Sequence, residues 1–242
     1  MRTLLALAAV LIAGCAHQQP PAEPAAQVGL TYAGEIPCAD CPGQQITLTL
    51  FPDYTYRLRL TFLAAAGGSN RQHYELGRWA RAQDGGSLRL RSGTRVVRLF
   101  RFVPGDRLRM LDREGGEIRS PHNYELARQA AVDPVAGPMR LRGMYAYTAG
   151  GAQFTECLSG KRFPVALERG QADLGKAYLA QRRQPGDLIL ATLSGSFAER
   201  RPDAGAASRE HLIVEQFERL LPGETCARRA APRQIVKSDF TL

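Results

Sequence analysis

The sequence is poor in the residues and motifs from which enzyme active sites and metal centres are usually built. Only four of its 242 residues are histidine, and they lie far apart without the short spacing of metal ligands: His17, His73, His122 and His211. The sequence has no Gly-x-Ser-x-Gly, no His-Glu-x-x-His and no phosphate-binding loop. These absences exclude the common hydrolase, metalloprotease and nucleotide-binding motifs, and we therefore expect a protein that is not an enzyme.

The apolar run near the N-terminus, residues 4–12, is too short to span a bilayer as a helix. It follows Arg2 and leads into Ile12-Ala13-Gly14-Cys15, which resembles the lipobox of bacterial lipoprotein signals. In such signals the cysteine is lipidated and becomes the first residue of the mature protein, whereas an ordinary signal peptide would be cleaved nearby. Ala16 stands where an Asp would retain a lipoprotein at the inner membrane. We therefore expect Cys15 to anchor the protein in the outer membrane, facing the periplasm or in part exposed at the cell surface.

The predicted signal occupies residues 1–15. Two changes of composition divide the chain that follows it. Residues 16–28 contain three prolines and no large apolar side chain, which is typical of an extended tether. Residues 129–138 are again rich in alanine and proline and predict a linker. The rest is long enough for two domains of about 100 residues each, which we expect at residues 29–128 and 139–242.

Short alternating runs predict that the first domain is all-β. The clearest run is residues 54–62, in which every second residue is apolar or aromatic and Thr and Arg lie between. No stretch of this domain has a helical period. Similar runs separated by turn residues predict a meandering antiparallel barrel or sandwich, and they lie at residues 46–50, 73–80, 87–90, 95–103 and 107–111. Trp79, the only tryptophan, is expected to plug the barrel floor, with ligand stacking as the alternative.

The second domain combines strands with one helix. Residues 171–182 can form a helix with Leu174, Ala177, Tyr178 and Gln181 along one side. Three strands are predicted before this helix and two after it, at residues 141–148, 154–157, 163–167, 188–197 and 211–217. That order fits a small closed barrel such as an OB-fold. Nucleic-acid binding, a common use of that fold, is not expected of a protein outside the cytoplasm.

A Cys-x-x-Cys, Cys38-Ala39-Asp40-Cys41, stands before the alternating run 46–50 and is predicted to lie in a turn between strands. A thioredoxin-type pair opens a helix whose N-terminus stabilises the thiolate, whereas here Pro42-Gly43 and a strand follow. Disulfide-exchange catalysis is therefore disfavoured. A structural disulfide closing so short a loop would contribute only about 2 kcal/mol. A redox-sensitive or metal-responsive turn remains open beside it, because two thiolates suit Cu(I) or Zn(II).

Without Cys15, four cysteines remain for disulfides in an oxidising periplasm: Cys38, Cys41, Cys157 and Cys226. Four cysteines allow three pairings. Proximity in the sequence favours Cys38–Cys41, which leaves Cys157–Cys226. The second bridge would close a long loop and would contribute about 4 kcal/mol.

The chain carries a formal net charge of +9, supplied mostly by arginine. Arginines alternate with apolar residues in the predicted strands of the first domain, and a solvated outer sheet face is the favoured interpretation. The alternative is a basic surface for anionic lipid headgroups or an acidic partner. The residues concerned are Arg57, Arg59, Arg89, Arg91, Arg98, Arg101, Arg107 and Arg109.

Several motifs in combination resemble the NlpE family of outer-membrane lipoproteins. In the first domain these are residues 32–41, Gly77-Arg78-Trp79-Ala80 and residues 110–115. In the second domain they are residues 141–145, Phe154-Thr155-Glu156-Cys157, residues 160–163 and residues 177–180. The resemblance covers nearly all of the mature chain. It implies an N-terminal barrel similar to a bacterial lipocalin, a C-terminal OB-like barrel and no catalysis.

The resemblance also implies a function. Family members are linked to copper homeostasis and signal surface contact, failed lipoprotein maturation or copper stress to the periplasmic domain of an inner-membrane sensor kinase of the Cpx type. The second-domain cysteines of the family would correspond to Cys157 and Cys226, with a looser match around Cys226. We expect no required cofactor. Cu(I) could bind only at the Cys38/Cys41 pair, with Asp40 as a further candidate ligand, since Met110, Met139 and Met144 do not form a Met-rich copper-carrier pattern. The competing hypothesis is a binding module, either a lipocalin-like carrier or a periplasmic Cu(I) buffer.

Overall fold

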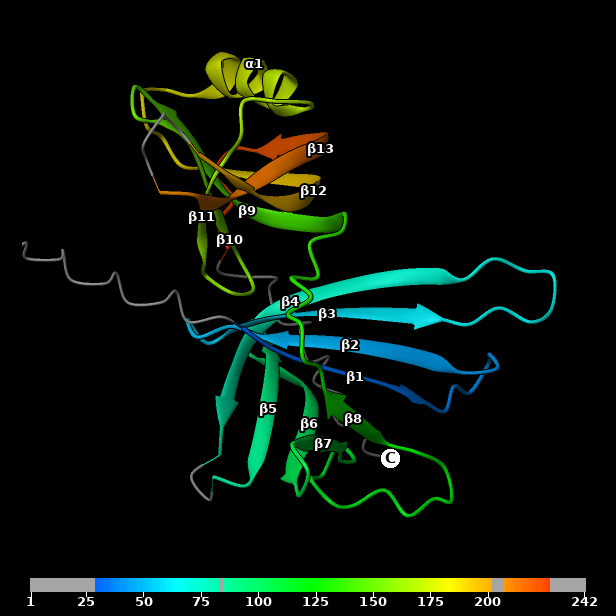
Figure 1. Cartoon of the computed structure of the whole chain (residues 1–242). Coiled ribbons are helices and arrows are strands. Elements are labelled where there is room, and N and C mark those ends of the chain that lie inside the picture. Colours follow the sequence, from blue (N-terminus) through cyan, green and yellow to red (C-terminus); the bar gives the residue numbers. More distant parts are fainter. Residues whose placement is uncertain (1–28, 83–84, 202–206, 227–242) are drawn as a thin grey trace, which may run out of the picture.

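The computed structural model describes residues 29–82, 85–201 and 207–226, and β-strands dominate these ranges (Figure 1). The signal with Cys15 and the tether at residues 16–28 lie outside the described residues. No helix among the described residues has the length and apolar character needed to cross a membrane. Figure 1 shows two β-units, with the second sheet and its helix above the first barrel.

The first unit is a closed barrel of eight antiparallel strands in sequence order. Each strand pairs with the next along the chain, and β1 pairs with β8 at Tyr32–Arg128 and Ala33–Ala127 to close it. The expected meander is therefore confirmed as a barrel. Its strands are β1 (Leu30–Ile36), β2 (Gln44–Leu50), β3 (Thr55–Phe62), β4 (Arg71–Arg81), β5 (Ser87–Ser92), β6 (Arg95–Val103), β7 (Arg107–Met110) and β8 (Glu125–Arg128).

Side-chain alternation places one face of each strand in the barrel core, as the sequence pattern predicts. In β2 the inward residues Ile46, Leu48 and Leu50 are almost fully buried. Trp79 packs against the same core, and its indole N–H donates to the carbonyl of Phe51 at 2.9 Å. Gly77 lets β4 approach β5, because a Cβ there would lie 2.1 Å from the carbonyl oxygen of Arg91.

The second unit is a five-stranded sheet in the order β11-β10-β9-β12-β13. A single parallel bridge between Val165 and Leu212 brings its two edges together, as in a partly open barrel. Its strands are β9 (Met139–Thr148), β10 (Gly151–Glu156), β11 (Arg162–Pro164), β12 (Ile189–Arg200) and β13 (Arg209–Leu221).

Helix α1 (Gln171–Gln181) lies on the side of this sheet away from the first barrel (Figure 1). Leu174 and Tyr178, two of the residues predicted to share a face, are fully buried. The Tyr178 ring meets Tyr145 of β9 edge to face, and its hydroxyl donates to the carbonyl of Asp187 at 2.9 Å. Burial of one face therefore holds this short helix on the sheet.

The connector at residues 129–138 is held along the outside of the first barrel. Thr49 donates its hydroxyl to the Asp133 carbonyl at 2.5 Å, and the Asp133 carboxylate pairs with Arg59 at 2.7 Å. Val135 is fully buried. The connector thus fixes the second unit against β2 and β3, where a composition-based prediction indicates only a linker.

Candidate functional site

The Cys-x-x-Cys lies in the loop between β1 and β2, at one rim of the barrel. Cys38 follows the end of β1 at Ile36, and Cys41 precedes the start of β2 at Gln44. The structure joins the two cysteines in a disulfide with a Cα–Cα distance of 5.2 Å. No helix begins beside them, so no helix N-terminus stabilises a thiolate there. The position therefore favours a structural or responsive turn over exchange catalysis.

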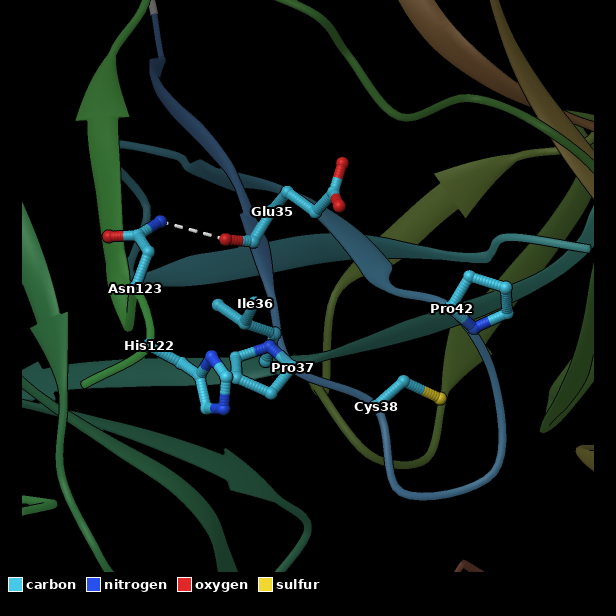
Figure 2. Close-up of a pocket in the computed structure, with 7 residues that line it drawn as sticks. All are labelled: Glu35, Ile36, Pro37, Cys38, Pro42, His122 and Asn123. Atoms are coloured by element: carbon cyan, nitrogen blue, oxygen red, sulfur yellow. Dashed lines mark hydrogen bonds between the residues drawn. The ribbon is translucent and has the colours of Figure 1, made fainter. Parts of the chain in front are cut away.

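An open cavity of about 500 Å³ adjoins this disulfide (Figure 2). The loop before β8 forms its other side, and Asn123 of that loop donates its amide to the Glu35 carbonyl of β1 at 2.7 Å. Figure 2 shows the His122 ring close to Pro37, on the opposite side of the cavity from Pro42. The cavity is lined by Glu35, Ile36, Pro37, Cys38, Pro42, His122 and Asn123.

The described residues contain no group of three or more His, Cys, Asp and Glu side chains arranged to hold a metal ion. In a disulfide the two sulfurs are also not thiolates, which are the form that binds copper. The residues present therefore fit a soft metal only after Cys38 and Cys41 have been reduced.

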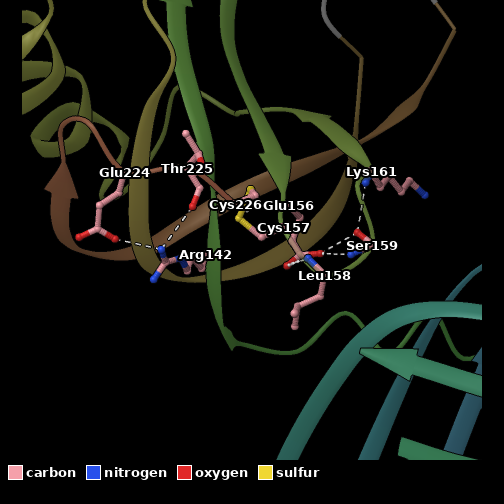
Figure 3. Close-up of a disulfide and its surroundings, with 9 residues drawn as sticks. All are labelled: Arg142, Glu156, Cys157, Leu158, Ser159, Lys161, Glu224, Thr225 and Cys226. Atoms are coloured by element: carbon pink, nitrogen blue, oxygen red, sulfur yellow. Dashed lines mark hydrogen bonds and ion pairs between the residues drawn. A yellow bond between two sulfur atoms is a disulfide. The ribbon is translucent and has the colours of Figure 1, made fainter. Parts of the chain in front are cut away.

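The second disulfide joins Cys157, in the turn between β10 and β11, to Cys226 beyond β13 (Figure 3). Glu156 organises this turn, because its buried carboxylate accepts the backbone N–H groups of Leu158 and Ser159 at 2.9 and 2.7 Å. It also accepts the Ser159 hydroxyl at 2.7 Å. Burial raises the pKa of the Glu156 carboxyl, although these hydrogen bonds act to lower it. The turn is therefore tightly bonded on one side and closed by the disulfide on the other.

The same turn touches the first barrel. The Ser159 carbonyl accepts a hydrogen bond from the guanidinium of Arg78, on β4, at 2.9 Å. Lys161 forms ion pairs with Asp53 of the first barrel at 2.9 Å and with Glu210 of β13 at 3.4 Å. The residues around Cys157 thus contact both units.

Next to this turn, the arginine Arg57 is buried between the two units. It lies on the outer face of β3, yet only 3% of its side chain is exposed. Its guanidinium pairs with Glu210 at 2.8 Å and lies 3.7 Å from the ring centroid of Phe197. Burial opposes ionisation of Glu210, but the hydrogen bond and charge of Arg57, aided by Lys161, outweigh it and lower the pKa of that carboxyl.

The arginines of the first barrel therefore do not form one solvated face. Arg101, Arg107 and Arg109 follow the prediction, because they form half-exposed ion pairs with Glu117 and Glu125. Arg57 departs from it, since the second unit covers its part of β3.

Arg98 also departs from the prediction of a solvated outer face. It lies opposite the buried Leu90, so it shares the inner face of the barrel, and it pairs with Glu75 at 2.8 Å. Period-two alternation indicates two faces of a strand but not what covers the outer one.

Two features of the structure escaped sequence reasoning. His122 is an exposed residue, and it lines the cavity beside Cys38 although the two residues are 84 positions apart (122 − 38). The contact between Arg57 and Glu210 joins two domains, and no local pattern marks it. Only a correlation between distant positions in related sequences could have indicated either contact.

Comparison with known proteins agrees with this architecture in both units. The family model described as the NlpE N-terminal domain matches residues 32–121, and the one described as the NlpE C-terminal OB domain matches residues 135–227. Lipoprotein NlpE of Escherichia coli (strain K12) is 36% identical over 198 residues, which cover 81% of this chain and 80% of that protein. The chain belongs to the NlpE family.

Two solved structures are also similar to this NlpE-family protein. One is the crystal structure of the Cpx pathway activator NlpE from Escherichia coli, which is 36% identical in sequence and has a TM-score of 0.36. The match covers 81% of this chain and 97% of that chain. The other is a putative lipoprotein from Shewanella oneidensis, with 28% identity, 43% of this chain and 91% of that chain covered, and a TM-score of 0.35. The closed eight-stranded barrel and the match to the OB domain model confirm the expected all-β fold of a barrel followed by an OB-like domain, and α1 is the one helix among the described residues.

Proposed function

We propose that this NlpE-family protein is an outer-membrane lipoprotein that senses envelope stress and signals to the periplasmic domain of an inner-membrane, Cpx-type sensor kinase. The observation that carries the proposal is its 36% identity, across both units, to a protein described as a Cpx pathway activator. Cys15 supplies the lipid anchor, and residues 16–28 supply the reach from the membrane. The stresses are surface contact, copper, lipoprotein mislocalisation and redox defects.

A reporter of the Cpx-type pathway tests this function in cells that express the full-length protein. Overproduction of the protein should raise reporter output, and a strain that lacks the sensor kinase should show no rise. Cys15→Ala, which removes the lipidation site, serves as the matched variant and should change both fractionation and output. Output that rises equally without the kinase would refute the proposed route.

A metal- or redox-responsive turn at Cys38 and Cys41 is a second function, favoured by the open cavity that adjoins the pair. Reduction would give two soft thiolates at this rim, suited to Cu(I), and the role would be sensing or buffering. Stoichiometric Cu(I) binding by the reduced protein, lost in Cys38→Ser/Cys41→Ser, would support a binding module. A variant that no longer binds Cu(I) but still activates the pathway under other stresses would support the signalling function.

A further inference from the structure

Three arginines on the outer face of β4 and β5 form no ion pair with a carboxylate of the described residues. Arg78 of β4 lies directly opposite Arg91 of β5. Arg89 comes two positions before Arg91 and shares its face, and all three residues are exposed. Like charges directly opposite each other on neighbouring strands destabilise a sheet. The fold therefore carries a repulsion at this place that an anion from outside the chain would relieve.

The next two strands show how the chain neutralises the same arrangement elsewhere. Arg101 of β6 and Arg109 of β7 also lie opposite each other, but Glu117 pairs with both of them, at 2.7 and 3.9 Å. Glu125 pairs with Arg109 as well, at 2.5 Å. The unneutralised charge of this outer face thus lies on its β4 and β5 part.

The two opposed arginines line an open cavity of about 320 Å³. The turn between β5 and β6 lines it too, with Gly93 and Thr94. The second unit borders this turn, because a Cβ at Gly93 would lie 3.7 Å from the side chain of Leu158. Arg78 is held in place by its hydrogen bond to the Ser159 carbonyl at 2.9 Å. Two guanidinium groups at one cavity suit a phosphate group, which accepts hydrogen bonds from several N–H donors at once.

Exposed apolar side chains surround the cavity. The Tyr54 ring lies 5.1 Å from the ring of Trp79, one of the residues that line it. Val96 lies opposite Arg91 in the pairing of β5 with β6, and Leu158 lies beside Gly93. Tyr54, Val96 and Leu158 are all exposed. Arginines among exposed aromatic and aliphatic side chains are typical of a surface that lies on a membrane.

The tether joins the barrel beside this cavity. Strand β1 begins at Leu30, opposite Leu50, so the chain enters next to the turn between β2 and β3. In that turn the Phe51 carbonyl accepts the indole N–H of Trp79, and the Tyr54 carbonyl accepts the backbone N–H of Trp79. The cavity and the entry of the tether therefore lie at the same end of the barrel.

The tether is short compared with the protein. Thirteen residues (28 − 15) separate Cys15 from Gly29, the first described residue. They reach about 20 Å as a flexible coil and about 40 Å when extended. A domain of about 100 residues is itself about 35 Å across. A lipid anchor at Cys15 therefore keeps this end of the barrel close to the bilayer.

We propose that the cavity between β4 and the β5–β6 turn binds the phosphate of an anionic phospholipid in the bilayer that carries the anchor. Arg78 and Arg91 bind the phosphate, Arg89 adds charge attraction, and the first barrel lies with this face on the membrane. The Cys38/Cys41 rim, at the far end of β1, then points away from the bilayer. The proposal rests on the lipid anchor of the proposed function, but not on signalling to a kinase.

The full-length lipoprotein reconstituted into vesicles tests the proposal. Trp79 is the only tryptophan and lines the cavity, so energy transfer from Trp79 to a dansyl-headgroup lipid measures how close this face lies to the bilayer. Transfer should be higher in phosphatidylcholine vesicles that contain about one quarter phosphatidylglycerol than in phosphatidylcholine alone. The gain should be lost in about 1 M salt, where the Debye length is about 3 Å.

Two matched variants locate the attraction. Arg89→Gln/Arg91→Gln should lower the ratio of docked to undocked protein about thirtyfold, and so remove the gain. Arg101→Gln/Arg109→Gln removes the same charge from the same sheet face, but these arginines are already paired, so most of the gain should remain. Equal losses in the two variants would show attraction by net charge alone and would refute a site at the cavity.

Flotation with phosphatidylcholine vesicles separates the anchor from the docking face. A protein that does not float lacks the anchor, and both the proposed function and this proposal then fail. A protein that floats but shows no gain with phosphatidylglycerol refutes the docking alone, a result that an acidic protein partner on this face would give. Glycerol phosphate is the lipid-free probe. If it protects Arg78 and Arg91 from phenylglyoxal and phosphatidylglycerol does not, the cavity takes free phosphate esters and the docking proposal is wrong.

Discussion

Removing one disulfide should lower the free energy of unfolding much more than removing the other. Cys157 and Cys226 are 69 residues apart, whereas Cys38 and Cys41 are three apart. The chain-entropy model gives about 4 kcal/mol for the longer loop and about 2 kcal/mol for the shorter one. At a typical urea dependence of about 2 kcal/mol per molar, the unfolding midpoint should fall by about 2 M in Cys157→Ser/Cys226→Ser and by about 1 M or less in Cys38→Ser/Cys41→Ser.

The chain offers a separate probe for each unit. Trp79, the only tryptophan, lies in the first barrel, so its fluorescence follows that unit. Among the described residues the only helix is α1, so helical ellipticity follows the second. The loss in Cys157→Ser/Cys226→Ser should appear first in the ellipticity. Equal midpoint shifts in the two variants, or a larger shift without Cys38 and Cys41, would refute the loop-length reasoning.

Further predictions concern the interface, the anchor and the copper response. Because the pKa of Glu210 is lowered in the folded chain, its pairing with Arg57 and Lys161 contributes stability above the ordinary glutamate pKa of about 4.3, and that contribution is lost as the pH falls through the lowered value. The reactivity of the Arg57 guanidinium toward an arginine-specific reagent such as phenylglyoxal, followed by mass spectrometry as the pH is lowered, should show this loss. In Glu210→Gln, Arg57 should react already at neutral pH. An Arg57 reactivity that does not change with pH would contradict the pairing. Cys15→Ala should abolish incorporation of labelled palmitate, and labelling that persists would overturn the lipobox interpretation. Cys38→Ser/Cys41→Ser should blunt the copper response and spare the others, and turnover in an insulin-reduction assay that the same change removes would instead show catalysis.

Much of the first barrel follows from local pattern, because strict alternation indicates strands whatever their partners are. Residues 54–62 alternate without interruption, and β3 occupies all but the first of them. Strand β8 was not predicted, because Glu125-Leu126-Ala127-Arg128 places its two apolar residues side by side and shows no alternation. Its pairing with β1 is nevertheless what closes the barrel.

The candidate site was predictable where the sequence places its parts close together. The turn position of Cys38 and Cys41 follows from the strand after them. The surroundings of Cys157 do not, because Arg78, Asp53 and Glu210 come from distant strands. Arg57 looked like a solvated residue since alternation alone cannot indicate that a second domain covers it.

The most direct test of the signalling account is the Ala16→Asp variant in a Cpx-type reporter strain. This change should hold the full-length lipoprotein at the inner membrane, close to the sensor kinase, which fractionation can verify. The account predicts that reporter output then rises strongly and that the rise requires the kinase. Unchanged output from a protein shown to be retained at the inner membrane would contradict it.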